Sequence, residues 1–244
     1  MFNKYTAGLV TSIILMLSHS GFSQEDYFGK FEGYTGLIGT LYDLKLDKKG
    51  RDTKVSHDGK AVDKTAFYKE LDKLIRAKLE TEKLEKFRTG DEQQDLMYLV
   101  MKFQKADFLP GGFGSPYIDP KGLLICFEGT IESAPEAEIR FAGSFDDTLV
   151  VMVNDKLVFY SAWDNFGRRK AFGESNKRKK TSRSERGASG DNYGEYIKLK
   201  KGDNIKLAFA EIPGGYVGGA LKVQLKGKEY NCLLYTSPSP RDRG

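Results

Sequence analysis

A series of short apolar segments in the second half of the chain constrains the fold more than any other feature. Each segment is rich in Val, Ile, Leu and aromatic residues and ends at a turn signal, a pattern typical of half-buried β-strands. Asn154 and Asp155 form a tight hairpin signal between two of them. These segments predict an antiparallel β-sandwich. They are residues 123–133, 137–144, 148–154, 156–163, 195–201, 204–212 and 220–227.

The first half of the chain predicts one further strand and one long helix. Residues 34–47 alternate small and apolar side chains and predict a strand, which a polar loop (48–60) follows. Residues 63–87 predict a helix that packs outside the sandwich, capped by Asp63 and ended at Gly90. Its apolar stripe has helical spacing and consists of Phe67, Leu71, Leu74, Ile75 and Leu79.

The segment between this helix and the strand series is less clear. Residues 95–103 are apolar and fit either a strand or a short helix, and residues 108–122 are rich in Gly and Pro and predict a long loop. The expected fold is therefore mainly β: an antiparallel β-sandwich with one long packed helix (about 63–87) and a long basic loop.

Both ends of the chain differ from the expected domain. Residues 1–23 carry Lys4, an apolar run and small residues up to Ser23, the layout of a cleaved secretory signal peptide, with an uncleaved anchor as the alternative. Residues 232–244 read like a translated sequencing-library adapter, so we treat them as a scar on a natural protein that continues past Asn231. We expect the domain to span 24–231, with no membrane span after signal cleavage.

Few residues in this segment can support redox or histidine chemistry. Cys126 is its only cysteine, so no internal disulfide can form, and its place in an apolar strand predicts a buried, inert thiol. His57 is its only histidine, which leaves almost nothing for a histidine-based triad or a multi-histidine zinc site.

Asp146 and Asp147 are adjacent carboxylates at the start of an apolar strand, where Asp is disfavoured. The pair has three interpretations: a turn device, an acid/base dyad, or part of a metal site. A dyad is the weakest of these, because the catalytic carboxylates of glycosidases lie about 5–10 Å apart across a cleft.

Two stretches resemble a known family. Residues 126–159 ("CFEGTIESAPEAEIRFAGSFDDTLVVMVNDKLVF") resemble the centre of a PA14-type domain, and residues 197–225 ("IKLKKGDNIKLAFAEIPGGYVGGALKVQL") resemble its closing section. The "GTLYDLK" stretch resembles the opening strand of a secreted bacterial subgroup, so the likeness covers about 36–226. It implies a PA14-like β-sandwich, a fold found in adhesins, glycosidases, toxins and envelope proteins.

The resemblance also implies a calcium site. Several PA14 lectins use the Asp-Asp pair, sometimes joined by a cis peptide bond, to hold a Ca²⁺ ion that binds sugar hydroxyls. Asp146 and Asp147 match that pair, Glu211 matches the third side-chain ligand, and carbonyls of residues 213–216 could complete the shell of oxygens that Ca²⁺ prefers. Glu211 departs from the shorter Asn that is usual in sugar-binding members.

Residues beside this expected site could contact a sugar. Trp163 and Tyr216 flank its rim and could stack on sugar faces, although Trp163 also suits the core. Gly214 and Gly215 form a Gly-rich loop that we place among the ligand-binding residues.

A long basic insertion (164–194) takes the place of the family's sugar-selecting loop. Residues 168–187 hold nine basic residues against two acidic ones, which fits either a solvated loop or a polyanion contact. The loop has no regular aromatic interleaving, so we expect no specific nucleic-acid binding. The polyanion-contacting residues would be Arg168, Arg169, Lys170, Lys177, Arg178, Lys179 and Lys180.

These features predict a secreted or periplasmic binding module that is not an enzyme. Its expected ligand is a carbohydrate or another cell-envelope polymer, with Ca²⁺ as the expected cofactor. Two alternatives remain open: a structural or assembly protein of the envelope without a small ligand, and an accessory domain of an enzyme whose catalytic part is missing.

Overall fold

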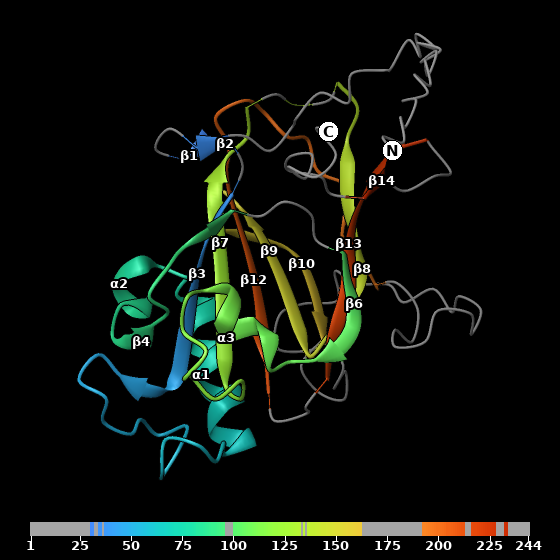
Figure 1. The fold of residues 1–244 in the computed structure, drawn as a ribbon. Helices are drawn as coiled ribbons and strands as arrows, with labels where there is room; N and C mark the ends of the chain where they lie inside the picture. Colours follow the sequence, from blue (N-terminus) through green and yellow to red (C-terminus); the bar gives the residue numbers. More distant parts are fainter. Residues whose placement is uncertain are drawn as a thin grey trace, which may run out of the picture.

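The computed structural model consists of two facing β-sheets, and the helices Lys64–Arg76 and Thr81–Leu84 lie on the outer side of one of them (Figure 1). It describes residues 30–31, 34–35, 37–95, 100–132, 134, 136–162, 192–212, 216–227 and 232–233.

The larger sheet has seven antiparallel strands. Its order is β10-β9-β12-β7-β3-β4, and β5 also pairs with β3. The strands are β3 (Ile38–Asp47), β4 (Phe87–Thr89), β5 (Gln94–Asp95), β7 (Leu123–Thr130), β9 (Thr148–Val153), β10 (Lys156–Ala162) and β12 (Asn204–Glu211).

The smaller sheet has five antiparallel strands. Its order is β11-β8-β13-β14, and β6 also pairs with β13; two short strands, β1 and β2, pair separately. This architecture confirms the predicted antiparallel β-sandwich. The remaining strands are β1 (Lys30–Phe31), β2 (Tyr34–Thr35), β6 (Val100–Lys105), β8 (Ile139–Asp146), β11 (Asn192–Tyr193), β13 (Tyr216–Leu225) and β14 (Cys232–Leu233).

Alternation along the strands separates two apolar clusters, as strand β9 illustrates. Leu149 and Val151 belong to the cluster between the two sheets, together with Phe141 and Leu221 of the smaller sheet. Val150 and Met152 belong to the cluster on the other face of the larger sheet, with helix side chains such as Phe67 and Leu71. The larger sheet is therefore covered on both faces, which explains why its strands are continuously apolar.

Helix α1 (Lys64–Arg76) covers the outer face of the larger sheet. The predicted cap is confirmed, because the Asp63 carboxylate accepts a hydrogen bond from the Ala66 amide over 2.9 Å. Every residue of the predicted apolar stripe is buried.

The prediction of a single helix over 63–87 is wrong at its C-terminal end. Lys78 and Leu79 adopt left-handed backbone conformations, with φ of 57° and 53°. Their amides donate to the carbonyls of Ile75 and Leu74, which closes the helix end in a Schellman arrangement. A short helix α2 (Thr81–Leu84) and strand β4 follow. Leu79 is buried at this turn. Its apolar side chain therefore fits the helical spacing of the sequence although it lies beyond the end of α1, which explains why the predicted helix is too long.

Two other segments differ from the prediction. Residues 195–201 form no strand, and only Ile197 pairs there, in an isolated bridge with Ile139. Within the expected loop 108–122 lies a five-residue helix, α3 (Phe108–Gly112). The hairpin at Asn154 and Asp155 is as predicted, with positive φ at both residues.

Several predictions concern residues outside the described part of the chain. The expected signal peptide (1–23) and most of the basic insertion lie there. Of the expected adapter-derived tail, Cys232 and Leu233 are described, and their backbone pairs with β13. In the described ranges, no helix has the length and apolar character needed to cross a membrane.

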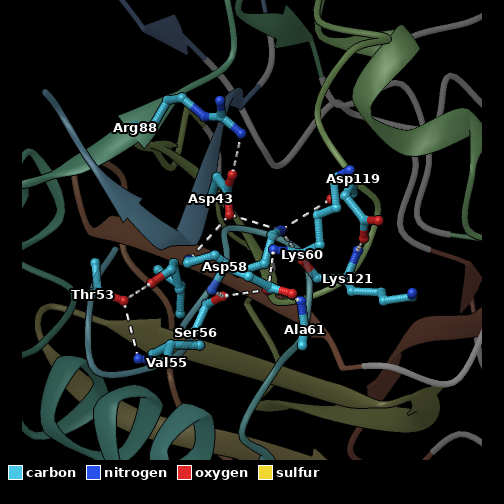
Figure 2. A network of polar contacts seen from close by, with 12 residues as sticks. Asp43, Thr53, Val55, Ser56, Asp58, Lys60, Ala61, Arg88, Asp119 and Lys121 are labelled. Carbon is cyan, nitrogen blue, oxygen red and sulfur yellow. Dashed lines mark hydrogen bonds and ion pairs between the residues drawn. The ribbon is translucent and has the colours of Figure 1, made fainter. Parts of the chain in front are cut away.

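A buried charge network fixes one end of β3. Lys45 and Asp43 have completely buried side chains, with Lys45 Nζ 2.8 Å from Asp43 Oδ1. The second carboxylate oxygen of Asp43 binds Arg88 at 2.5 Å, so the aspartate lies between two cations (Figure 2). Burial lowers the pKa of Lys45, while the charge of Asp43 opposes that shift.

The loop before β7 covers this network. The Lys45 ammonium donates to the carbonyls of Asp119 and Lys121, and the Leu44 amide donates to that of Gly122. Gly122 has a φ of +67°, and a Cβ there would lie 3.1 Å from Lys45 Cγ, so the close approach favours glycine. The loop therefore closes the sandwich over a charged pair rather than over an apolar one.

Candidate functional site

The chain passes from one sheet to the other at the Asp146–Asp147 pair. Asp146 is the last residue of β8, in the smaller sheet, and Thr148 is the first residue of β9, in the larger sheet. Asp147 is thus the single residue between the two sheets, and the peptide bond that joins the pair is cis. The pair is more than an ordinary hairpin turn, because it connects the two layers.

Asp147 is held to the end of the neighbouring strand β12. Its Oδ2 accepts a hydrogen bond from the Ile212 amide over 2.7 Å. In the sheet, Thr148 lies opposite Ala210, so the last residue of β12, Glu211, ends at the same edge as the Asp pair. Glu211 is expected from the sequence as the third ligand beside the pair, and that role stays a prediction.

Asp146 lies in an environment that disfavours its charge. Its side chain is half-buried, and its backbone lies opposite Gly218 of β13. Burial, followed by the hydrogen bond and negative charge of Asp147, raises the pKa of Asp146 to about 7. This pKa is far above that of an ordinary aspartate, which is about 3.9.

Glu211 is almost completely buried, at 1% exposure, and Thr148 beside the pair is buried too. In the described part of the chain, no three His, Cys, Asp or Glu side chains come together as a group that could hold a metal ion. The fold therefore brings Asp146 and Asp147 together and ends Glu211 at the same sheet edge, without gathering the three carboxylates into one cluster.

The roles of the other predicted ligand-binding residues stay predictions. Trp163, Gly214 and Gly215 lie outside the described residues, as do the basic residues of the insertion. Tyr216 is the first residue of β13, with its backbone opposite Lys105.

Sequence reasoning missed a second feature, two hollows along helix α1. One, of about 510 Å³, lies between α1 and residues 53–55 and 83–87; the other, of about 600 Å³, follows the helix itself. Basic residues outnumber acidic ones in the lining of both, and Lys73 belongs to both. The signal was present in the sequence, because Lys69, Lys73 and Arg76 have the spacing of one helix face.

Comparison with known proteins gives structural likeness only. No protein-family model matches the sequence, and no curated protein matches it. The PA14 domain of the antifreeze protein MpAFP is 12% identical with a TM-score of 0.47, covering 83% of this chain and 88% of that domain. The PA14 sugar-binding domain from an RTX adhesin is 12% identical with a TM-score of 0.46, covering 84% of this chain and 99% of that one.

An anti-sigma factor domain-containing protein from Clostridium clariflavum is 13% identical, with a TM-score of 0.45. The match covers 86% of this chain but 48% of that protein, so the chain spans about half its length. The chain is thus similar to PA14 domains of known structure.

Proposed function

We propose that the protein is a secreted or periplasmic carbohydrate-binding module without catalytic activity of its own, with its ligand site at the Asp146–Asp147 junction. One observation carries this proposal: two adjacent carboxylates lie where the chain crosses between the sheets, and one of them has a pKa near neutrality. The resemblance of residues 126–159 to PA14 domains points to the same pair.

A divalent cation suits this pair. Adjacent carboxylates repel each other, and this repulsion, together with burial, favours the protonated form of Asp146. A Ca²⁺ ion could replace that proton, because it is a hard cation that prefers carboxylate oxygens. Asp146 and Asp147 would hold it, while Glu211, at the end of the adjacent strand, is not gathered with them into one cluster and would be a further ligand only if it approached the pair. When bound, such an ion would coordinate neighbouring hydroxyl groups of a sugar.

The chain's own residues would set the orientation of the site. Asp147 Oδ2 accepts a hydrogen bond from the Ile212 amide, which fixes its carboxylate beside Asp146. Asp146 is fixed through the β8–β13 pairing at Gly218. Both sheets therefore hold the two carboxylates in place. A rigid pair of this kind suits a binding site.

The position of the carboxylates argues against glycoside hydrolysis at this pair. A general acid and its partner in glycosidases lie about 5–10 Å apart across a cleft. Asp146 and Asp147 are instead consecutive residues joined through a side-chain hydrogen bond.

Glycan-array binding tests the proposal in the presence of millimolar calcium. Asp147→Asn keeps an oxygen that can accept the Ile212 amide but removes the charge, so we expect binding to fall at least tenfold while folding is retained. Asp52→Asn, which removes an exposed carboxylate from another loop, is the matched control and should bind as the parent does. Equal binding by the parent and Asp147→Asn would contradict the proposed site, and no binding by the parent would favour a structural or assembly protein.

The basic insertion is a separate proposed contact for polyanions. Its support is the sequence alone, namely the basic residues between Arg168 and Lys180. Retention on a heparin column should fall when these residues are neutralised.

A further inference from the structure

Basic side chains are concentrated around the two hollows on the surface beside helix α1. The two hollows that flank the helix adjoin at Lys73, which lines both of them. Their lining includes seven basic side chains, all exposed, against three acidic ones. We name this surface the α1 groove. Its basic residues are Lys54, Lys64, Lys69, Lys73, Arg76, Lys83 and Lys86.

All three acidic residues of the lining have interaction partners, and the ion pairs of Glu70 and Asp47 can be given in detail. Glu70 binds Lys73 over 3.0 Å and Lys86 over 2.5 Å, which joins α1 to the segment between α2 and β4. Asp47 binds Arg51, outside the lining, at 2.6 Å. Burial of Glu70 opposes its ionisation, but the hydrogen bonds from Lys86 and Lys73 outweigh burial and lower its pKa. The acids therefore neutralise part of the charge and hold Lys73 and Lys86 in place, and the lining keeps an excess of four positive charges.

Three cations form a row along the helix. Lys69, Lys73 and Arg76 are four and three residues apart, so they share one face of α1. With a rise of about 1.5 Å per residue, the row extends roughly 10 Å along the helix axis. A row of this length matches a linear polymer with repeated negative charges better than it matches a single small anion.

We propose that the α1 groove binds a linear anionic polysaccharide, bearing sulfate or carboxylate groups, along the row Lys69–Lys73–Arg76. This site is separate from the Asp146–Asp147 junction and from the basic insertion, so it does not depend on either. Binding would be electrostatic and salt-dependent, because the cations are exposed and mostly lysines, which act as point charges.

The lining favours a polysaccharide over nucleic acid. Proteins that bind single strands stack bases on exposed aromatic rings. The aromatic residues that line the groove, Tyr68 and Phe87, are buried, with 6% and 2% exposure. A row of lysines beside buried rings can neutralise charge, but it offers no stacking surface.

Heparin binding measured at several salt concentrations tests the proposal on the full chain. Lys69→Gln/Lys73→Gln/Arg76→Gln removes the row. Lys198→Gln/Lys200→Gln/Lys201→Gln removes three exposed charges from the loop before β12 and serves as the matched control. We expect the row variant to elute at lower salt than the control, and its slope of log affinity against log salt to fall by about two to three. Thermal unfolding of both variants reports their folding.

Two results would overturn the proposal. Equal elution of the row and control variants would show that net charge, rather than the groove, determines binding. A row variant that loses affinity for a DNA oligonucleotide but keeps that for heparin would assign the groove to nucleic acid instead.

Discussion

Replacing Lys45 by methionine should destabilise the fold more than any exposed charge change. The ammonium of Lys45 has three acceptors, Asp43 and the carbonyls of Asp119 and Lys121, and its side chain is fully buried. Methionine preserves most of the apolar volume but donates to none of them. Asp43 would keep Arg88 as a partner, yet half of its buried charge would lose compensation.

The expected cost follows from the burial of the pair. Removing one partner of a buried ion pair costs about 3–5 kcal/mol, because the other charge remains desolvated. For a domain of this size, such a loss lowers the melting temperature by roughly 10 °C. Urea unfolding, followed by far-UV circular dichroism, measures the free energy directly.

Two further variants show whether the pair itself is responsible. Lys48→Met removes a cation from the exposed pair with Glu85, whose side chains are 59% and 58% exposed, so it should cost less than about 1 kcal/mol. Asp43→Leu/Lys45→Met replaces both buried charges and should regain much of the lost stability. A Lys45→Met variant as stable as Lys48→Met would refute this account of the network.

Three smaller predictions test other parts of the structure. The folded protein binds a proton at Asp146 more tightly than the unfolded chain does, so without metal its free energy of unfolding should fall as the pH rises from about 4 to 7 and then level off. Urea midpoints measured across that range should show this fall in the parent protein and no such fall in Asp146→Asn. Burial raises the pKa of the Cys126 thiol to about 12, so a Cys232→Ser variant should react with a thiol reagent only on unfolding, and fast labelling in native buffer would contradict this. Asp63→Ala removes the cap of α1 and should cost about 1 kcal/mol in urea unfolding, whereas an unchanged midpoint would deny the cap a role.

The sandwich strands were predictable because their pattern depends on local alternation. Strands such as β9 and β12 are apolar on both sides and end at turn residues, so their bounds follow from the sequence. Residues 195–201 also alternate, but only Ile197 finds a partner strand. Alternation indicates a segment that can pair, whereas pairing itself depends on which strand lies beside it.

The helix end and the buried charges could not be predicted for physical reasons. Lys78 takes the left-handed position that glycine usually occupies, so the sequence gives no stop signal before Gly90. Asp43 and Lys45 alternate with apolar residues in β3, which normally indicates a solvated face. They are buried because the loop ending at Gly122 covers them, a contact between residues far apart in the chain.

The candidate site was predictable in part. The Asp146–Asp147 pair stood out because carboxylates are rare at the start of an apolar strand, and its resemblance to PA14 domains added Glu211. The hydrogen bond from the Ile212 amide to Asp147 requires the three-dimensional register of β9 and β12. The basic row on α1 was visible in the sequence, but its hollows depend on the break after Arg76 and the return of the chain at β4.

Thermal unfolding with calcium and then with EDTA tests the central claim, that Asp146 and Asp147 form a cation-assisted ligand site. Binding to the folded state alone stabilises it by about 2.7 kcal/mol when calcium is at one hundred times its dissociation constant. We therefore expect the melting temperature to rise by several degrees in calcium, to return to its starting value in EDTA, and to be unaffected by calcium in Asp147→Asn. A melting temperature that is the same with millimolar calcium and with EDTA, or a rise that persists in Asp147→Asn, would contradict the claim.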